Sequence, residues 1–285
     1  MAGVVYGNTT VNIHGGQVVR NVYGAGAMGS VGKATTANDV TTVSGGTTTI
    51  NVSGGTVGVD GTNGDGNVFG AARGDASATI NQFALVRKST NVSVTGGTIK
   101  GDVYGGGELG SVGTFTVSND MRTFTWQNTD GNDNTAANTG ICNVTVNGSS
   151  AVIEGNVFGA GKGKDDSFWC EKGIAYSTNV SVTDGTVKGN IYGGGEVGRV
   201  ETDTQVKIGN GAGTAGGAST PTITGSVFGG GAGVETHGYS ALVRNNTTVT
   251  VEGNAAVGKS VYGGGEIASV GKYGLDAQKM PSILQ

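Results

Sequence analysis

Four charged residues of alternating sign recur in the chain at positions that could bring them into one line. Each stands four residues after an aromatic residue of a repeated glycine-rich block: Arg73, Glu108, Lys162 and Glu196. If the repeats stack as parallel strands, successive members of this series lie about 4.8 Å apart. A carboxylate beside a basic group can act as an acid–base pair in polysaccharide cleavage. Because a catalytic site usually occurs once in a chain, we favour the alternative, a surface charge ladder whose ion pairs each stabilise little.

Two segments rich in aspartate and asparagine could supply oxygen ligands for calcium. They are TDGNDNTA (129–136), with Asp130, Asn132 and Asn134, and VDGTNGDGN (59–67), with Asp60, Asn63 and Asp65. Neither has the glycine and distal glutamate of an EF-hand loop or the nonapeptide of calcium-binding β-rolls. Asn, Asp and Gly are also ordinary turn residues. We therefore predict no cofactor, with calcium as the open alternative.

The other reactive residues are few and scattered. His14 and His237 lie in different repeats without a neighbouring cluster of cysteines or carboxylates, which argues against a zinc site or a Ser-His-Asp triad. Cys142 and Cys170 could pair or stay free. The segment GAGAMG (24–29) fits the dinucleotide-binding pattern, but it opens no predicted helix and lacks a phosphate-binding lysine. We predict no metal, nucleotide or catalytic site.

Two insertions, 113–142 and 164–173, break the symmetry of the repeats. They carry the carboxylates that do not recur: Asp120, Asp130, Asp133, Asp165, Asp166 and Glu171. A glycosidase needs two carboxyl groups about 5–9.5 Å apart, so a catalytic site could form only where these insertions overhang the body. We predict that the chain is not an enzyme.

The longer insertion has the alternating pattern of an extra hairpin. Its apolar positions are Phe115, Met121, Phe124 and Trp126, and the turn is predicted near Asn128–Asn134. We expect Phe124 and Trp126 to pack on the flank of the body. Insertions on repeat scaffolds often carry binding surfaces, so this region is where a ligand would be sought.

The sequence repeats with a period of about 35 residues, and this repeat predicts the strands that position the residues above. A Val-aromatic-Gly block recurs with its aromatic at Tyr23, Phe69, Tyr104, Phe158, Tyr192, Phe228 and Tyr262. Before each copy, polar and β-branched residues alternate as in a half-buried strand. We expect the first apolar residues of these segments to form one ladder of stacked strands: Val11, Ile50, Val92, Val144, Val180, Val206 and Val249. VVYG (4–7) is interpreted as a partial copy in an atypical terminal unit.

The aromatic residues are expected to stack in one largely buried column. Phe alternates with Tyr along the series, so half of the sites need no hydroxyl, which favours burial over an exposed sugar-binding strip. The residue two positions earlier is Asn, Asp or Ser and shares the same face of its strand, so it would form a polar ladder. The Tyr copies also share a continuation, such as ELGSVG (108–113), which makes a pair of repeats the evolutionary unit.

Composition agrees with an all-β fold. Of 285 residues, 58 are glycine and 2 are proline, which excludes collagen. The net charge of −4 without a basic run argues against nucleic acid as a partner. No apolar run reaches the roughly 18 residues of a transmembrane helix, and the first residues do not resemble a signal peptide.

We therefore predict a β-solenoid, in the form of a parallel β-helix with about seven coils. An all-β repeat array of another winding is the alternative. A single domain is expected over residues 1–273, with insertions near 27–48 and 113–142, and residues 274–285 are expected to form a C-terminal tail or cap.

The motif VYGGGELGSVG, preceded by NVSVTGGTIKGD, resembles the glycine-rich β-solenoid repeats of large bacterial surface and secreted proteins, including adhesins and autotransporter passengers. The resemblance implies a non-enzymatic structural or adhesive module, located at the cell surface or outside the cell and flanked by further repeats of a longer chain. It implies a glycan, or a host or bacterial surface protein, as partner, and no membrane insertion. A carbohydrate-binding or polysaccharide-degrading β-helix protein is the alternative.

Overall fold

The alternating polar and β-branched segments form the long strands of one parallel sheet. These strands pair in chain order and are β2 (Thr9–Ile13), β8 (Thr47–Val57), β10 (Ser89–Ile99), β14 (Ile141–Ile153), β16 (Ser177–Val182), β19 (Thr204–Ile208) and β22 (Thr247–Val251). Short strands after the corners extend the same sheet: β3 (Gln17–Val18), β17 (Thr186–Val187), β20 (Thr222–Ile223) and β23 (Ala256–Val257). The register places Val11, Ile50, Val92, Val144, Val180, Val206 and Val249 side by side, so the predicted ladder is confirmed.

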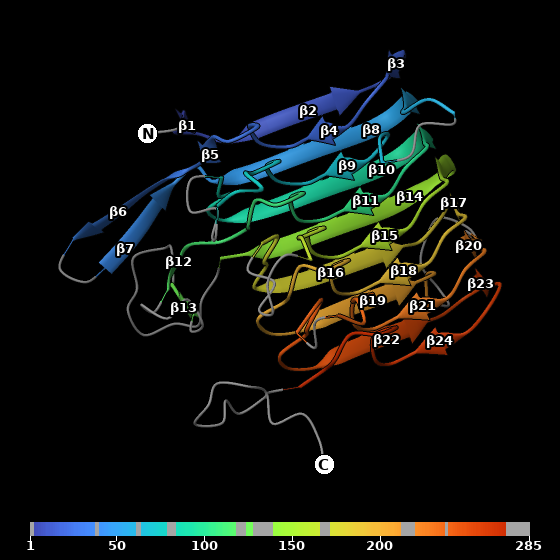
Figure 1. Cartoon of the computed structure of the whole chain (residues 1–285). Helices are drawn as coiled ribbons and strands as arrows, with labels where there is room; N and C mark the ends of the chain where they lie inside the picture. The colour runs from blue at the N-terminus through green and yellow to red at the C-terminus, as the bar shows by residue number, and fades with distance from the viewer. Residues whose placement is uncertain are drawn as a thin grey trace.

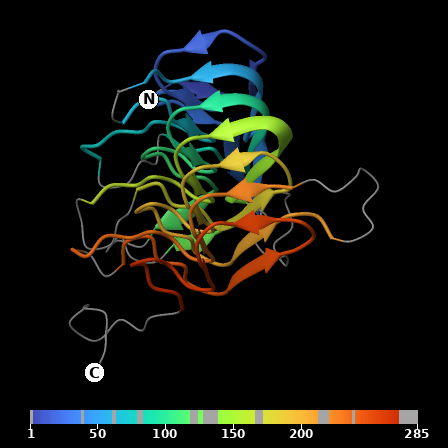
Figure 2. The same ribbon diagram turned by 90° about the vertical axis from the view of Figure 1, so that its right-hand side faces the viewer.

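This computed structural model describes residues 3–37, 40–60, 64–78, 84–117, 124–127, 139–165, 172–211, 220–236 and 239–271. All regular secondary structure in these ranges is β, and the coils stack from the N-terminal end to the C-terminal end (Figures 1 and 2). None of the described segments is a helix with the length and apolar character that would let it cross a membrane.

The aromatic blocks form a second parallel sheet on another side of each coil. Its strands also pair in chain order: β4 (Val22–Tyr23), β9 (Val68–Phe69), β11 (Val103–Tyr104), β15 (Val157–Phe158), β18 (Ile191–Tyr192), β21 (Val227–Phe228) and β24 (Val261–Tyr262). We number the coils one to seven by these aromatic residues, from Tyr23 to Tyr262. Two parallel ladders wound through the same coils define a parallel β-solenoid, as predicted.

A third ladder completes each coil. It consists of single parallel bridges that link Val31 to Val86 and Val112, and Ala175 to Val200, Val243 and Val270. Strand β1 (Val4–Val5) pairs with β5 (Ser30–Val31) and so extends this ladder. The interpretation of VVYG (4–7) as a partial aromatic copy is therefore wrong. Val5 pairs with Val31 of the third ladder, and Tyr6 lies outside the aromatic column because its strand occupies a different side of the coil.

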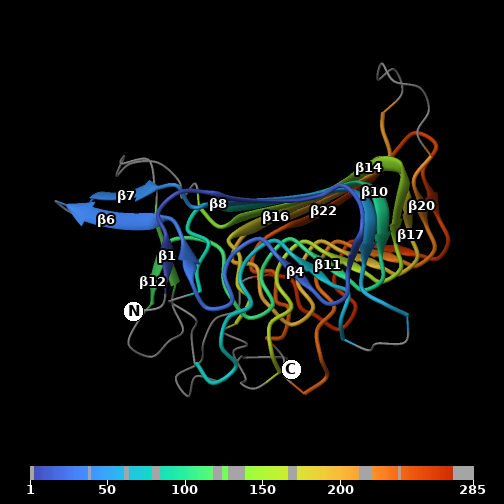
Figure 3. The ribbon, with the colours of Figure 1, turned by 90° about the horizontal axis from the view of Figure 1, so that it is seen from above.

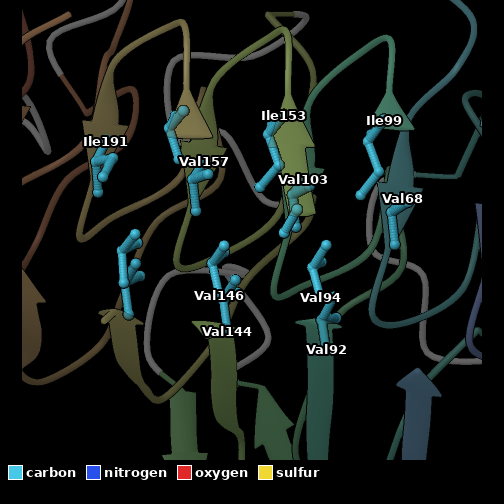
Figure 4. Close-up of a cluster of buried hydrophobic side chains, with 14 of the residues drawn as sticks. Val68, Val92, Val94, Ile99, Val103, Val144, Val146, Ile153, Val157 and Ile191 are labelled. Carbon is cyan, nitrogen blue, oxygen red and sulfur yellow. The ribbon is translucent and has the colours of Figure 1, made fainter. Parts of the chain in front are cut away.

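The hydrophobic core runs along the inside of the solenoid. Val92 and Val94 of the long strand, Ile99 after the corner and Val103 of the aromatic block point into the same interior and are at most 2% exposed. Figure 4 shows how equivalent residues of successive coils form continuous rows. Burying one such side chain stabilises the fold by about 1.5–3 kcal/mol. One coil cannot enclose this interior alone, so stability depends on stacking.

The glycine after each aromatic residue is required by the closeness of adjacent coils. A Cβ atom on Gly70 would lie 2.1 Å from the carbonyl oxygen of Gly105 in the next coil, and one on Gly105 would lie 2.2 Å from that of Gly159. The same carbonyls accept hydrogen bonds from buried threonines of the long strands, such as Thr48 Oγ1 to Gly70 at 2.5 Å. The threonine column comprises Thr9, Thr48, Thr90, Thr178, Thr204 and Thr247. Cys142 occupies the equivalent position in coil four.

Two antiparallel hairpins leave the coils on the same side. One joins β6 (Lys33–Ala37) to β7 (Val40–Ser44) and extends outward (Figure 3). The other joins β12 (Phe115–Val117) to β13 (Phe124–Trp126), with Phe115 opposite Trp126. The predicted second hairpin is confirmed, but the predicted turn near Asn128–Asn134 is wrong: the chain reverses between Val117 and Phe124, because the two aromatic segments pair with each other.

The second hairpin packs on the solenoid flank as expected. Phe115 and Phe124 form a buried cluster with Leu85 and Ile174 of the coils, and Trp126 packs against this cluster. Met121 lies outside the described residues.

Candidate functional site

The aromatic residues stack as one column on the face of their sheet that points away from the valine core. Neighbouring ring centroids are 4.7 Å apart for Phe69 and Tyr104 and 4.8 Å apart for Tyr104 and Phe158, and both pairs are nearly parallel. The rings from Phe69 to Phe228 are at most 6% exposed, while Tyr262 in coil seven is 48% exposed. The predicted buried column is therefore confirmed. Stacked pairs add about 0.5–1.5 kcal/mol each beyond their burial.

The tyrosine hydroxyls of this column bind glutamates two coils away. The hydroxyl of Tyr23 donates a hydrogen bond to Glu108 at 2.5 Å, and that of Tyr104 donates to Glu196. Tyr192 donates to Glu266 at 2.5 Å. Each contact skips the intervening Phe coil, so the alternation of Tyr and Phe reflects a pairing between every second coil. Sequence reasoning treated the hydroxyl as dispensable and missed this role; the signal was that Glu stands only in Tyr copies.

A polar ladder runs beside the aromatic column. The Oδ1 atom of Asn67 accepts a hydrogen bond from the backbone N–H of Asp102 at 2.7 Å, and Oδ1 of Asp102 accepts one from Asn156 N–H at 2.6 Å. The contact repeats at Asn190 and Ser226. The predicted ladder is confirmed, and it joins each coil to the next by a side-chain hydrogen bond to backbone.

The predicted column of charges exists, but its members do not pair as expected. Backbone hydrogen bonds join its levels, such as Leu109 N–H to the carbonyl of Arg73 at 2.7 Å and Gly163 N–H to that of Glu108 at 2.8 Å. Within the described part of the chain, no ion pair joins neighbouring charges of this column. Its glutamates bind tyrosines instead. Burial raises the pKa of Glu196, and the hydrogen bond from Tyr104 and the charge of Lys162 act in the opposite direction.

A pocket opens where this column passes coils one to three. It has a volume of about 370 Å³ and is lined by Met28, Arg73, Gly74, Asp75, Ala76, Glu108 and Leu109. We call it the Arg73 pocket. It brings together two members of the predicted charge series, Arg73 and Glu108. It also includes Asp75, which sequence reasoning missed because Asp75 lies in a segment, ARGDAS (72–77), that resembles an ordinary loop.

The Arg73 pocket contains charges of both signs. Asp75 accepts hydrogen bonds from Ser77 N–H at 2.9 Å and Ser77 Oγ at 2.7 Å. These bonds lower the pKa of Asp75, with smaller contributions from the positive charges of Lys172 and Arg73. The ammonium group of buried Lys172 donates to the carbonyl of Ala76 at 3.0 Å. Burial and the Glu108 carboxylate raise the pKa of Tyr23, so its hydroxyl stays protonated and fixes the position of that carboxylate.

A buried ionic cluster, which sequence reasoning also missed, lies beneath the second hairpin. Glu201 binds Arg199 and Arg244, each at 2.8 Å, and the side chains of Glu201 and Arg199 are each 3% exposed. The Arg199 guanidinium also lies 4.5 Å from the centre of the Phe124 ring. Arg199 and Glu201 belong to the segment GRVE (198–201), which stands where another Tyr copy has GSVG, and this difference was the available signal.

In segment 59–67, one of the two considered for calcium, the aspartates face basic groups. Asp60 binds Lys100 at 2.9 Å, and Asp65 binds Arg20 at 3.2 Å. Among the residues that the structure describes, no group of three or more His, Cys, Asp or Glu side chains converges as a metal site. Asn63 and segment 129–136, with Asp130, Asn132 and Asn134, lie outside the described residues.

The other sequence candidates are separate from the Arg73 pocket. Cys142 is a free, buried cysteine, and burial raises the pKa of its thiol to about 12. His14 is exposed, with Nδ1 2.8 Å from Ser53 Oγ. Asp165 accepts a hydrogen bond from Thr236 Oγ1 at 2.9 Å. Segment 24–29 opens no helix. Outside the described residues lie Asp120, Asp133, Asp166, Cys170, Glu171 and His237.

Together, the three ladders and the side-chain columns define the class of protein: a parallel β-solenoid that carries a mixed-charge pocket over its first coils. Comparison of the chain with protein-family models, curated proteins and solved structures found no match.

Proposed function

We propose that the chain is a non-enzymatic structural and adhesive repeat module of a large bacterial cell-surface or secreted protein. The observation that carries this proposal is the pairing of tyrosine with glutamate across every second coil. The three recurring glutamates, which were candidates for acid–base chemistry, hold the coils together through these tyrosines. Their role is therefore architectural.

The proposal is also supported by the shape of the molecule. Two parallel ladders, a stacked aromatic column and the polar ladder each join every coil to the next, and the bridges of the third ladder add further links. Such an array is a rigid spacer that can present loops and pockets at fixed positions. A repeat module of this kind suits a protein that projects a binding surface, and a glycan or a surface protein is the partner we expect.

The proposal is tested by measuring binding and turnover on the same purified chain. Binding is measured on a glycan array and on intact bacterial and host cells, and turnover is measured as the release of reducing ends from the polysaccharides that bind. We expect retention without turnover. Turnover that disappears in Glu108→Gln or Asp75→Asn would overturn the non-enzymatic assignment, and failure to bind any glycan or cell surface would overturn the adhesive one.

A carbohydrate-binding or polysaccharide-degrading protein is the second candidate, and the Arg73 pocket is the observation that favours it. Arg73, Asp75 and Glu108 converge on one hollow, which provides both hydrogen-bond donors and acceptors for a sugar. The reducing-end assay separates the two activities of this candidate, since a binding protein leaves the polymer intact.

A further inference from the structure

We propose that the Arg73 pocket binds a carboxylated sugar ring, with the carboxylate of the ligand on the guanidinium of Arg73. This inference deepens the proposed adhesive function, on which it rests for the expectation of a glycan, by naming the ligand class and the site. The volume of about 370 Å³ falls at the lower end of small-molecule sites, which span roughly 300–1,000 Å³. The pocket can therefore hold a single sugar residue, such as a chain end or a side branch.

Arg73 is available to bind an anion. Its side chain is exposed at the pocket, and within the described ranges it forms no hydrogen bond or ion pair. A guanidinium group presents two parallel N–H donors that match the two oxygens of a carboxylate, and this bidentate geometry gives specificity as well as strength. A carboxylate on the sugar supplies the ion-pair partner that the described part of the chain does not provide.

The charges around the pocket favour an anionic ligand despite its two carboxylates. Lys172 is 4% exposed and donates a hydrogen bond to the carbonyl of Ala76 in the pocket wall, so its positive charge lies behind the pocket. The ammonium group of Lys164 lies 3.5 Å from the same carbonyl. With Arg73, these two lysines place basic groups on and beside the pocket wall, and their positive charge attracts an incoming carboxylate.

The two acidic residues are suited to bind sugar hydroxyls. Glu108 is held in place by the hydroxyl of Tyr23, and Asp75 is held by two hydrogen bonds from Ser77 that favour its ionised form. An ionised carboxylate accepts hydrogen bonds only, and ring hydroxyls are the donors that it can bind. Met28, which is 38% exposed, and Leu109 provide apolar surface for the C–H face of a ring. The pocket therefore contains a partner for each part of a uronic acid.

The test compares three small probes by NMR titration of the full chain: sodium glucuronate, neutral glucose and sodium acetate. We expect glucuronate to bind about tenfold or more tightly than either control, because only it offers the carboxylate and the hydroxyls together. Arg73→Ala should weaken glucuronate binding about tenfold and Arg73→Lys should weaken it less, since lysine keeps the charge and loses the fork. Arg20→Ala, which removes an exposed arginine that binds Asp65 elsewhere, should leave the affinity unchanged.

Each other outcome overturns the inference. Equal affinity for glucuronate and glucose would exclude a carboxylate-specific site, and equal affinity for glucuronate and acetate would exclude recognition of the sugar. Undiminished binding by a folded Arg73→Ala chain would place the ligand elsewhere. The adhesive proposal is tested separately. If Arg73→Ala still binds glycan arrays or cells, the adhesive function does not depend on this pocket. If the parent chain binds glucuronate but no glycan array or cell, the adhesive function is disproved and the binding site remains.

Discussion

Replacing Tyr104 with phenylalanine tests the pairing of every second coil, because it removes one hydroxyl and preserves the ring stack. Phenylalanine already occupies the flanking levels of the column, so the substitution creates no clash and little change in buried apolar area. What is lost is the hydroxyl that donates to the partly buried carboxylate of Glu196 and that also lies 3.2 Å from the carboxylate of Asp102. A hydrogen bond to a charged group contributes about 1.5–3 kcal/mol. We expect a loss near the lower end of that range at pH 7, since Glu196 keeps some contact with water.

The same substitution predicts a dependence on pH with a definite sign. Burial raises the pKa of Glu196, and the Tyr104 hydroxyl acts against that increase, so its removal raises the pKa further. A carboxyl group with a raised pKa in the folded state binds more protons in the folded chain than in the unfolded chain, and stability then falls as the pH rises through that interval. The deficit of Tyr104→Phe should therefore be complete at pH 7 and smaller at about pH 4.5, the ordinary pKa of a glutamate carboxyl, because a carboxyl whose pKa is raised is already mostly protonated there.

Urea unfolding of the variant and the parent chain, followed by circular dichroism at both pH values, measures this effect. Tyr262→Phe is the matched control, since Tyr262 ends the described column, is 48% exposed and donates to no glutamate among the described residues. The reasoning is refuted if Tyr104→Phe is no more destabilising than the control at pH 7, or if its deficit grows on acidification.

Three further substitutions probe other parts of the structure. Gly105→Ala should destabilise the fold by at least about 2 kcal/mol in urea unfolding, because the new Cβ would overlap a carbonyl oxygen of the next coil. Gly263→Ala is the control and should be nearly neutral, since nothing lies within 4 Å of its Cβ position. Equal effects of the two substitutions would refute the close-packing argument. Glu201→Gln should lower the free energy of unfolding by about 3–5 kcal/mol, because it removes the buried carboxylate that pairs with Arg199 and Arg244. Lys188→Ala, in an exposed pair, should change it by less than about 1 kcal/mol, and an equally mild effect of Glu201→Gln would contradict the buried cluster. Cys142→Thr should leave stability unchanged or raise it by about 1 kcal/mol, because threonine occupies the equivalent site in the other coils and donates a hydrogen bond to a glycine carbonyl there. A clear loss of thermal stability would show that a threonine at this position does not stabilise the coil.

The sequence predicted the backbone architecture well because that architecture depends on period. Alternating β-branched residues at a spacing of about 35 residues leave stacking as the only way to bury apolar faces, so the ladder through Val92 and Val144 followed directly. The burial of Phe69 and Tyr104 followed from the exchange of Phe for Tyr in the series. Periodicity did not reveal contacts that skip a coil, such as Tyr104 with Glu196, because a side chain's reach depends on its direction in space.

The candidate site was harder to predict for a related reason. Arg73 and Glu108 were singled out by their shared offset from the aromatic residues, but Asp75 lies where the repeats differ and no offset marks it. The first residues were misassigned because VVYG matches the aromatic block by composition, while pairing with Val31 places it on another side of the coil. The hairpin turn was misplaced because Asn and Gly are common in the segment after Trp126, although Phe115 pairs with Trp126 itself.

The contact between a tyrosine and the glutamate two levels further on has a consequence for how such an array can grow or shrink during evolution. Deletion or duplication of one coil shifts all later levels by one, so a hydroxyl such as that of Tyr104 would face a level without its carboxylate. Gain or loss of two adjacent coils keeps every donor opposite its acceptor. The array therefore has a parity, and mutations that change its length in steps of two preserve it, although its backbone hydrogen bonds would accept a step of one.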